Sequence, residues 1–420
     1  MIISQAIHSS PATRILLVLL TLFLTVFVLL IYTLHHHHGE TIERGEFNQI
    51  KINVNHLEYF NQLTNLSDQI AYVKDIATEY GGAYALELLI ASDPIAGGDL
   101  HLLGHYAGDQ LYKDKGLEGM KVCTPDLWYA CSHSIVIGAL FEMGMSVFDQ
   151  VHDVCRKVPG PRGYLMCFHG FGHGVIAYTQ YEVPEAVELC KKVGTEAYDN
   201  AEAKECFGGV IMDLRDGLHD RELWEAYGRK YIPEGNPIGV CEAEYVPNDF
   251  KHMCYVFLTP FLFDYVGTVD IASEQEVAAA LALCEEVPTR QAKQYCYQGF
   301  PKEFISYIHN RNLSAYENTT DEQFLQMYSW CLLSQSELGV TECVKSSVQA
   351  IDRAGTAPYD LTIRFCSLLG RTEHQDICYN ELTFARAYAN IHPDENEGYC
   401  SAIPEKYEEM CLHTMNLHSP

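Results

Sequence analysis

The sequence predicts an all-α protein: a disulfide-clipped helical-hairpin repeat array (α-solenoid) with one N-terminal transmembrane helix. Three observations predict this fold class. The chain of 420 residues has an uncharged apolar run near its start, its 16 cysteines fall into local pairs, and amphipathic stretches flank those pairs. Apolar residues in these stretches recur at steps of three and four residues, as in helices that bury one face.

The apolar run extends from Ile15 to Leu34 and contains no charged residue. At about 1.5 Å per residue it is roughly 30 Å long, which matches the hydrocarbon thickness of a bilayer. We find no A-x-A-like cleavage site, so we expect an uncleaved anchor rather than a signal peptide. Arg14 precedes the run, and Glu40 and Glu43 follow it. The positive-inside rule then makes residues 1–14 a cytoplasmic tail and places the main domain in a periplasm, at a cell surface or in a lumen.

The run of four histidines from His35 to His38 marks residues 35–54 as a His-rich juxtamembrane linker. No Ser/Gly-rich or low-complexity stretch interrupts residues 55–420, so we expect one extracytoplasmic helical-repeat domain there. Its first part, residues 55–116, keeps the helical pattern without cysteine. We interpret this part as a capping unit followed by a first hairpin.

Eight cysteine pairs mark the repeat units. The second cysteine of a pair recurs every 33 to 48 residues, a period typical of stacked helical hairpins. One cysteine ends a predicted helix and the next begins another, so a disulfide would clip each hairpin. Local pairing is the simplest of many connectivities, and so many cysteines favour an oxidising compartment. The expected pairs are Cys123/Cys131, Cys155/Cys167, Cys190/Cys206, Cys241/Cys254, Cys284/Cys296, Cys331/Cys343, Cys366/Cys378 and Cys400/Cys411.

Charge and motif content exclude several functions. The chain has 56 acidic and 28 basic residues, a formal charge of −28, so it repels the phosphate backbone and we expect no nucleic-acid partner. No C-x-x-C is present, which excludes zinc ribbons and thioredoxin-type sites. Phosphate-binding glycine motifs, G-x-S-x-G and H-E-x-x-H are also absent.

Five of the 19 histidines are candidate metal ligands. His101 and His105 lie in HLLGH, and His169 and His173 lie in HGFGH, so each pair occupies one helix face. His133 and His169 both follow the second cysteine of a pair by two residues, a position that every hairpin repeats. Neighbouring helices pack about 8–10 Å apart. We therefore expect the five imidazoles to converge on one site.

Neutral imidazoles bind zinc, copper and iron, so the expected cofactor is a transition metal of this group. Asp99, Glu142 and Asp213 are candidate ligands or acceptors for imidazole N–H groups. The rival interpretation of the five residues is a polar histidine–aromatic cluster packed inside the array. Six other histidines are expected at the surface: His152, His219, His252, His309, His374 and His392.

Three functions fit these features. The first is a membrane-anchored extracytoplasmic protein that holds a transition metal in a polyhistidine site on its N-terminal repeats. The second is a metal-dependent oxidase or hydrolase that uses this site. The third is a metal-free scaffold with protein partners on its concave face. No catalytic nucleophile can be singled out, so catalysis stays open, but a scaffold gives no reason for imidazoles to concentrate in the first units.

Overall fold

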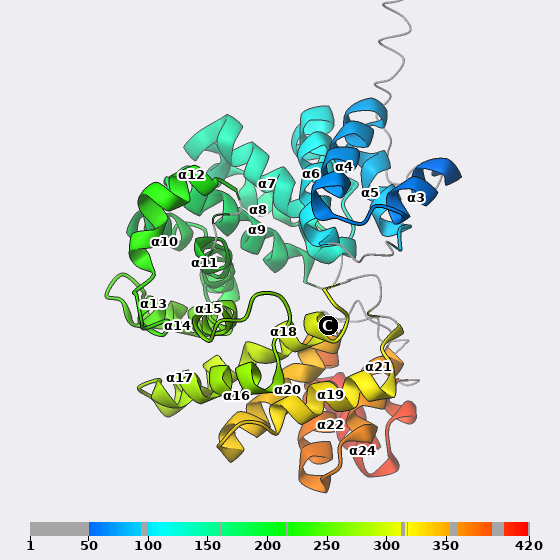
Figure 1. Ribbon diagram of the computed structural model, residues 1–420, viewed down its shortest axis with the longest axis vertical. Helices are drawn as coiled ribbons and strands as arrows, with labels where there is room; N and C mark the ends of the chain where they lie inside the picture. Colours follow the sequence, from blue (N-terminus) through cyan, green and yellow to red (C-terminus); the bar gives the residue numbers. More distant parts are fainter. Residues whose placement is uncertain are drawn as a thin grey trace, which may run out of the picture. The chain divides into compact units, whose positions relative to one another are not determined.

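A computed structural model describes residues 50–93, 99–159, 162–215, 217, 219–311, 316, 318–352, 359–388 and 399–418. The predicted cytoplasmic tail, the membrane anchor at 15–34 and nearly all of the linker lie outside these residues. Within them all regular secondary structure is helical, which confirms the all-α prediction (Figure 1). The described residues belong to a single unit, 47–420.

The helices are numbered as in Figure 1. Those of the first half are α3 (Val54–Asn61), α4 (Leu66–Tyr80), α5 (Gly82–Ile90), α6 (Leu100–Lys115), α7 (Ala130–Met143), α8 (Val151–Cys155), α9 (Gly163–Tyr178), α10 (Val183–Lys191), α11 (Ala201–Leu214) and α12 (Arg221–Leu223). Those of the second half are α13 (Gly239–Glu242), α14 (Lys251–Val256), α15 (Thr259–Tyr265), α16 (Glu274–Leu283), α17 (Arg290–Gln298), α18 (Phe300–Tyr307), α19 (Asp321–Cys331), α20 (Glu337–Asp352), α21 (Tyr359–Leu368), α22 (Thr372–Tyr388) and α24 (Glu405–His418).

All eight expected disulfides are present, and no cysteine is free. Most of them join the end of one helix to the next helix along the chain. For example, Cys155 ends α8 and bonds Cys167 in α9, and Cys331 ends α19 and bonds Cys343 in α20. The prediction of local helix-to-helix clips is therefore confirmed.

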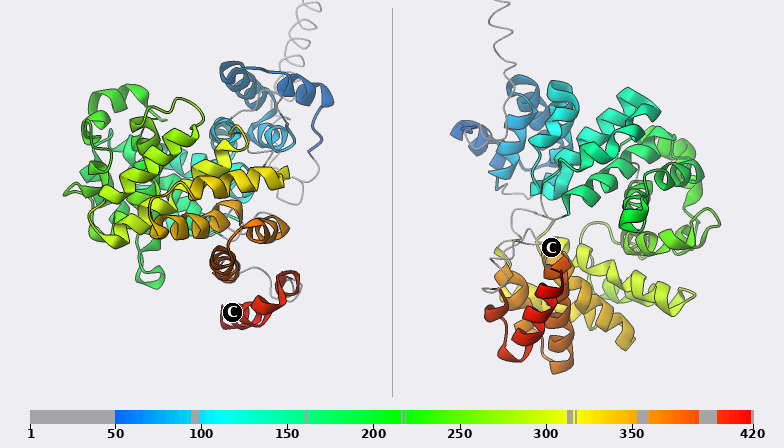
Figure 2. Two further views of the ribbon diagram at one scale, coloured as in Figure 1. Left: turned by 60° about the horizontal axis from the view of Figure 1, so that its bottom comes forward. Right: turned by 180° about the vertical axis from the view of Figure 1, so that it is seen from behind.

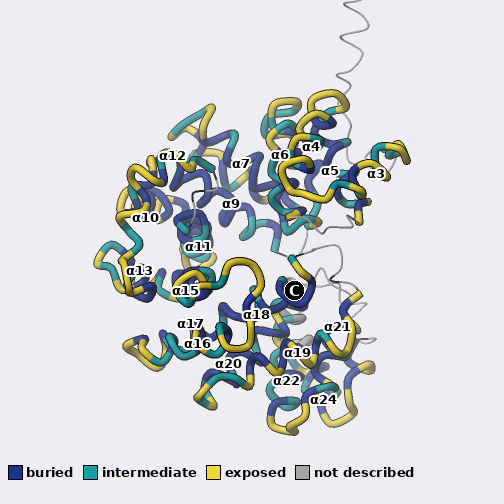
Figure 3. The backbone as a smooth tube through the Cα atoms, viewed as in Figure 1, coloured by how far each residue is buried: buried dark blue, intermediate teal, exposed yellow. Residues whose placement is uncertain are grey.

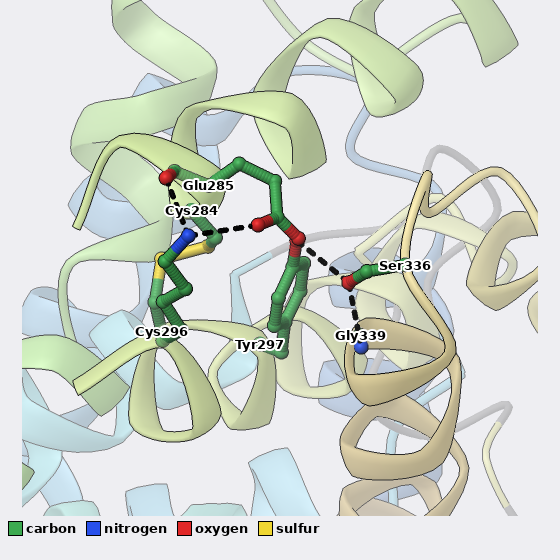
Figure 4. Close-up of a disulfide and its surroundings, with 7 residues drawn as sticks. Cys284, Glu285, Cys296, Tyr297, Ser336 and Gly339 are labelled. Carbon is green, nitrogen blue, oxygen red and sulfur yellow. Dashed lines mark hydrogen bonds and ion pairs between the residues drawn. A yellow bond between two sulfur atoms is a disulfide. The ribbon is translucent and has the colours of Figure 1, made fainter. Parts of the chain in front are cut away.

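The Cys284–Cys296 clip shows how polar contacts accompany a disulfide (Figure 4). Lys293 donates to the backbone oxygen of Glu285 at 2.7 Å and to its carboxylate at 2.9 Å. The Tyr297 hydroxyl donates to the same carboxylate at 2.5 Å. Hydrogen bonds from Ser336, Tyr297 and Lys293 lower the pKa of Glu285 to about 2. Through Ser336, the residue directly before α20, these hydrogen bonds link the disulfide-bonded segment to the start of that helix.

Helix α6 and the helices that carry the second cysteines pack on one another in chain order. Contacts link α6 to α7, α7 to α9, α9 to α11, α11 to α14, α14 to α17, α17 to α20, α20 to α22 and α22 to α24. The views of Figure 2 show the same succession by colour. The helices α7, α9 and α11 are the most enclosed, and they are drawn largely in the buried colour in Figure 3.

Glycines allow α9 and α11 to approach closely. A Cβ atom added at Gly172 would lie 1.8 Å from the backbone oxygen of Cys206, and one added at Gly209 would lie 2.0 Å from the backbone oxygen of His169. Side chains at these two positions would force the helices apart. Because both residues are glycines without a side chain, the backbone of α11 packs against the part of α9 that carries HGFGH.

One described helical stretch, Asp126–Asp149, is long and apolar enough to cross a membrane by length and composition. More than half of its most apolar window, 56%, is buried inside the protein. The stretch contains α7, which packs between α6 and α9. Its hydrophobicity is therefore accounted for by its place in the core.

Peptide mapping tests the clips. Digestion of the full-length protein without reductant should release eight linked peptide pairs, each joining cysteines 8 to 16 residues apart. The variant Cys284→Ser/Cys296→Ser should lose one linked pair and keep the other seven, because each clip is local. Thiols that react before reduction, or links between distant units, would contradict this arrangement.

Candidate metal centre

The structure brings the five candidate histidines into one cluster. His101 and His105 lie on α6, His133 on α7, and His169 and His173 on α9. The ring centroids of His101 and His105 are 4.8 Å apart, and each lies 5.6 Å from that of His133. The His133 ring lies 5.8 Å from His169 and 5.9 Å from His173. Residues spread over 73 positions of the chain thus share one interior region.

A hydrogen bond fixes the tautomer of His101. Its Nδ1 lies 2.8 Å from the backbone oxygen of Leu127, so this nitrogen carries the proton and Nε2 is unprotonated. Ser134 Oγ lies 2.8 Å from the backbone oxygen of His105 and 3.2 Å from His105 Nδ1, and its single proton can be donated to either atom. When Ser134 donates to the backbone oxygen, His105 Nδ1 donates to Ser134 and His105 Nε2 is unprotonated.

The Nε2 atoms of the two rings face each other at a distance of 3.3 Å. In the tautomer of His105 with an unprotonated Nε2, two lone pairs at that distance repel unless a cation lies between them. Two nitrogens bound to one tetrahedral zinc ion at about 2.0–2.1 Å are separated by about 3.3 Å. The spacing of the two rings is thus that of two ligands on one metal ion.

His133 and His173 supply further donors. Both ring nitrogens of His173 are buried without a hydrogen-bond partner among the described residues, and those of His133 are buried with only a weak interaction with the Met166 backbone. A buried polar atom without a partner is rare because it loses its hydration without compensation. One ring nitrogen of His101, one of His105 and one of His133 lie within 4.8 Å of one another. We call these three residues the first triad.

A second group lies next to the first triad and contains His219, for which a surface position was expected. That expectation is wrong: the His219 ring lies 5.6 Å from His105 and 5.5 Å from His173. His219 Nδ1 lies 3.0 Å from Asp213 Oδ1, and the other oxygen of Asp213 accepts from the Tyr181 hydroxyl at 2.8 Å. We call His173, Asp213 and His219 the second triad, since their donor atoms also lie within 4.8 Å of one another.

The sequence contained a partial signal for the second triad. Asp213 was a candidate acid, and it lies in α11 next to Met212, which occupies the repeat position of His173. His219 follows the end of α11, and its approach depends on the path of the chain after Leu214. Helical periodicity does not predict that path, so His219 was not predicted to lie in the site.

Other polar expectations had mixed outcomes. Asp99 caps α6 by accepting from Leu102 N at 2.9 Å, and Glu142 is exposed and accepts from the Tyr112 hydroxyl at 2.6 Å. His309 and His374 were expected at the surface but are 5% and 0% exposed, so that expectation is wrong. His309 Nε2 pairs with Thr319 and His374 Nδ1 pairs with Tyr328, whereas His374 Nε2 is buried without a hydrogen bond and lies 3.7 Å from Glu337.

Among the remaining expected surface histidines, His252 is exposed and His152 is half-buried. His392 lies outside the described residues.

Burial keeps the cluster uncharged. Loss of hydration lowers the pKa of His169 to about 3 and the pKa values of His105, His133 and His173 well below the usual range. It also lowers the pKa of His101. At neutral pH these rings are therefore in the form that binds a metal ion.

A strained turn forms one wall of the site. Leu127, Trp128 and Tyr129 have φ values of 55°, 55° and 64°, a left-handed conformation that side chains with a Cβ rarely adopt. The turn lies inside the short loop closed by Cys123–Cys131. It presents the Leu127 carbonyl to His101 and directs Trp128 and Tyr129 to a neighbouring cavity. Such strain persists only where surrounding structure enforces it, and it is frequent at functional sites.

That cavity has a volume of about 340 Å³, a size suited to a small organic molecule. His101, His133 and His169 line it, whereas His105, His173 and His219 do not. The first triad therefore faces the cavity, and the second triad lies behind it. Helices α6, α7, α9, α11, α18 and α20 all contribute residues to the wall.

Substitution of Gly170 tests the packing that positions His133. A Cβ atom there would lie 2.4 Å from His133 Cδ2 and 2.6 Å from its Cα, so Gly170→Ala must displace α7 from α9. Such overpacking should lower the free energy of unfolding by about 1–3 kcal/mol, measured by urea denaturation. Gly370→Ala is the control, because an added Cβ there meets no atom within 4 Å. Equal stability of the two variants would contradict this packing.

Acid should destabilise the metal-free protein through these rings. The folded-state pKa of His169, about 3, lies below the ordinary value of 6.5, so between these pH values the unfolded chain binds a proton that the folded chain excludes. Stability therefore falls as the pH decreases from 6.5, by about 1.4 kcal/mol per pH unit for this one group. Urea denaturation at pH 7, 6 and 5 should show a shallower loss for His169→Gln than for the native chain. Substitution of the exposed His413 by Gln is the control, and equal slopes for all three proteins would refute the expectation.

No protein-family model matches the chain, and neither a curated protein nor a solved structure matches it. The protein is disulfide-rich and its described part is all-helical, with a largely buried histidine cluster. This cluster is the basis for inferring its function.

Proposed function

We propose that the protein is a membrane-anchored, extracytoplasmic α-solenoid that holds a transition metal in a polyhistidine site on its N-terminal repeats. The single observation that carries this proposal is the 3.3 Å separation of His101 Nε2 and His105 Nε2 beside His133, a spacing that suits two ligands of one metal ion. A proton shared between two rings that are both protonated at Nδ1 would be costly, because burial disfavours the imidazolium form. A metal ion bound by both rings and by His133 would satisfy all three donors.

The second triad supports a second metal position. The carboxylate of Asp213 accepts from His219 Nδ1, an arrangement that orients an imidazole and leaves its Nε2 directed at a metal ion. Tyr181 holds the other carboxylate oxygen in place. His173 lies beside this pair with both nitrogens buried and without hydrogen bonds to described residues. Zinc, copper and iron all accept such ligand sets, and Met212, which lines the cavity, is a soft donor outside both triads.

Location and architecture are proposed from the cysteines and the apolar run. Eight disulfides favour an oxidising compartment outside the cytoplasm. Residues 15–34 would anchor the chain with its N-terminus in the cytoplasm. The ordered contacts from α6 through α24 are those that a solenoid of clipped hairpins would make.

A metal-dependent enzyme is the second candidate, and the cavity favours it. A metal ion in the first triad would have three protein ligands and would leave a position open toward the cavity, as catalytic zinc sites do. Water bound at that position would become a nucleophile near neutral pH. The metal-free scaffold accounts less well for buried imidazoles without hydrogen bonds, because each lowers stability unless a ligand satisfies it.

Elemental analysis of the purified full-length protein tests the proposal. The native chain should carry one or two ions of one transition metal, since two triads are available. His101→Ala/His105→Ala should lose the ion of the first triad, and Asp213→Asn/His219→Ala should lose that of the second. His413→Ala is the matched control, because His413 occupies the same repeat position as His133 but is exposed.

The scaffold would replace the metal proposal if all four proteins carried the same substoichiometric trace after incubation with zinc, copper(II) or iron(II). Circular dichroism on the same samples separates loss of a ligand from loss of the fold.

A further inference from the structure

We propose that the cavity beside the first triad binds a small organic oxyanion, a carboxylate or a phosphate ester with an apolar body, between the Lys302 ammonium and the metal-facing imidazoles. This inference rests on the proposed metal site and names the class of ligand that the site would receive.

The charge lining the cavity differs in sign from that of the whole protein. Three basic residues, Arg162, Lys302 and Arg311, and two acidic residues, Asp99 and Glu303, line it. The chain as a whole has twice as many acidic as basic residues. A metal ion in the first triad would add positive charge to this wall. The cavity would therefore attract an anion that the rest of the surface repels.

Lys302 is the basic residue best placed to hold a ligand. Arg162 already donates to Glu205 at 2.9 Å, and Arg311 donates to the backbone oxygen of Asp270 at 2.9 Å. Lys302 pairs with Glu303, whose carboxylate oxygen lies 3.7 Å from the ammonium, a longer contact than the 2.9 Å contacts of Arg162 and Arg311. Only 25% of its side chain is exposed. An ammonium that is largely withdrawn from water and so weakly paired can gain substantially from a ligand anion.

Contacts through Phe257 place Lys302 beside the histidines. The Lys302 ammonium lies 4.4 Å from the centre of the Phe257 ring, whose other neighbour is the His169 ring at 4.9 Å. The charge of Lys302 also helps to lower the pKa values of His101 and His169, after the larger effect of burial. An oxyanion in the cavity could thus contact the ammonium through one oxygen and a metal-bound position through another.

The rest of the wall suits an apolar body. Trp128, Phe257, Met166 and Met212 line the same space. The Trp128 indole nitrogen is buried and has no hydrogen-bond partner among the described residues, so it offers one donor to the ligand. At about 340 Å³ the cavity has room for a ring-sized group together with its anionic substituent.

Titrations with matched probes test this inference. Benzoate and phenyl phosphate are the anionic probes, and benzamide is a neutral probe of the same shape as benzoate. The full-length protein, loaded with zinc and assayed by calorimetry, should bind at least one anion ten-fold or more tightly than benzamide. The stronger of the two anions identifies the carboxylate or the phosphate class. Lys302→Met should weaken the binding of that anion at least ten-fold, whereas Lys302→Arg should keep most of it.

The zinc content of every sample is measured in parallel, so the two proposals fail separately. A normal zinc content with equal affinity for the anions and benzamide, or with no effect of Lys302→Met, would overturn the oxyanion site and leave the metal proposal intact. Absence of zinc with anion binding that still depends on Lys302 would overturn the metal proposal and support the anion site. Lys302→Arg and circular dichroism control for misfolding of the Lys302→Met variant.

Discussion

The central constraint in this structure is the close approach of imidazole nitrogens in a largely buried cluster. His101 Nε2 and His105 Nε2 lie 3.3 Å apart, and the hydrogen bond to Leu127 prevents His101 from turning its N–H toward His105. Burial opposes the protonation of either ring. The metal ion that we propose would satisfy both nitrogens.

The surrounding packing holds this arrangement in place. Gly170 leaves room for the His133 ring, and Gly172 and Gly209 let α9 and α11 approach until backbone meets backbone. Disulfides tie α9 to α8 and α11 to α10, which limits the movement of these two helices. The left-handed turn from Leu127 to Tyr129 adds strain where the site is built, and the Cys123–Cys131 clip encloses it.

The two sides of the cluster have different surroundings. The first triad borders the cavity, where Lys302 and aromatic rings meet it, whereas the second triad is backed by Asp213 and Tyr181. A ligand in the cavity could therefore reach the first of the two proposed metal positions, while the second would be supported by protein groups.

Much of this followed from the sequence. Cysteine spacing determined the eight clips, and helical periodicity determined the all-α class, because both depend on residues close together in the chain. The repeat position two residues after a cysteine identified His133 and His169, and the i,i+4 spacing identified their partners. These inferences needed only that successive hairpins present equivalent positions to the same side. An example is the cavity, which is lined by Met212, Lys302 and Gln349, each six residues after a cysteine.

Tertiary structure alone decided the rest. His219 follows a helix end, and no periodicity predicts where such a segment leads. The burial of His309 and His374 and the exposure of Glu142 depend on neighbours more distant in the chain, such as Tyr328 for His374. Lys302 occupies a repeat position, but its proposed role depends on the path that brings α18 to the same cavity as α6 and α9. Local spacing specifies what a helix can present, but the packing of distant helices decides which groups meet and which lose their water.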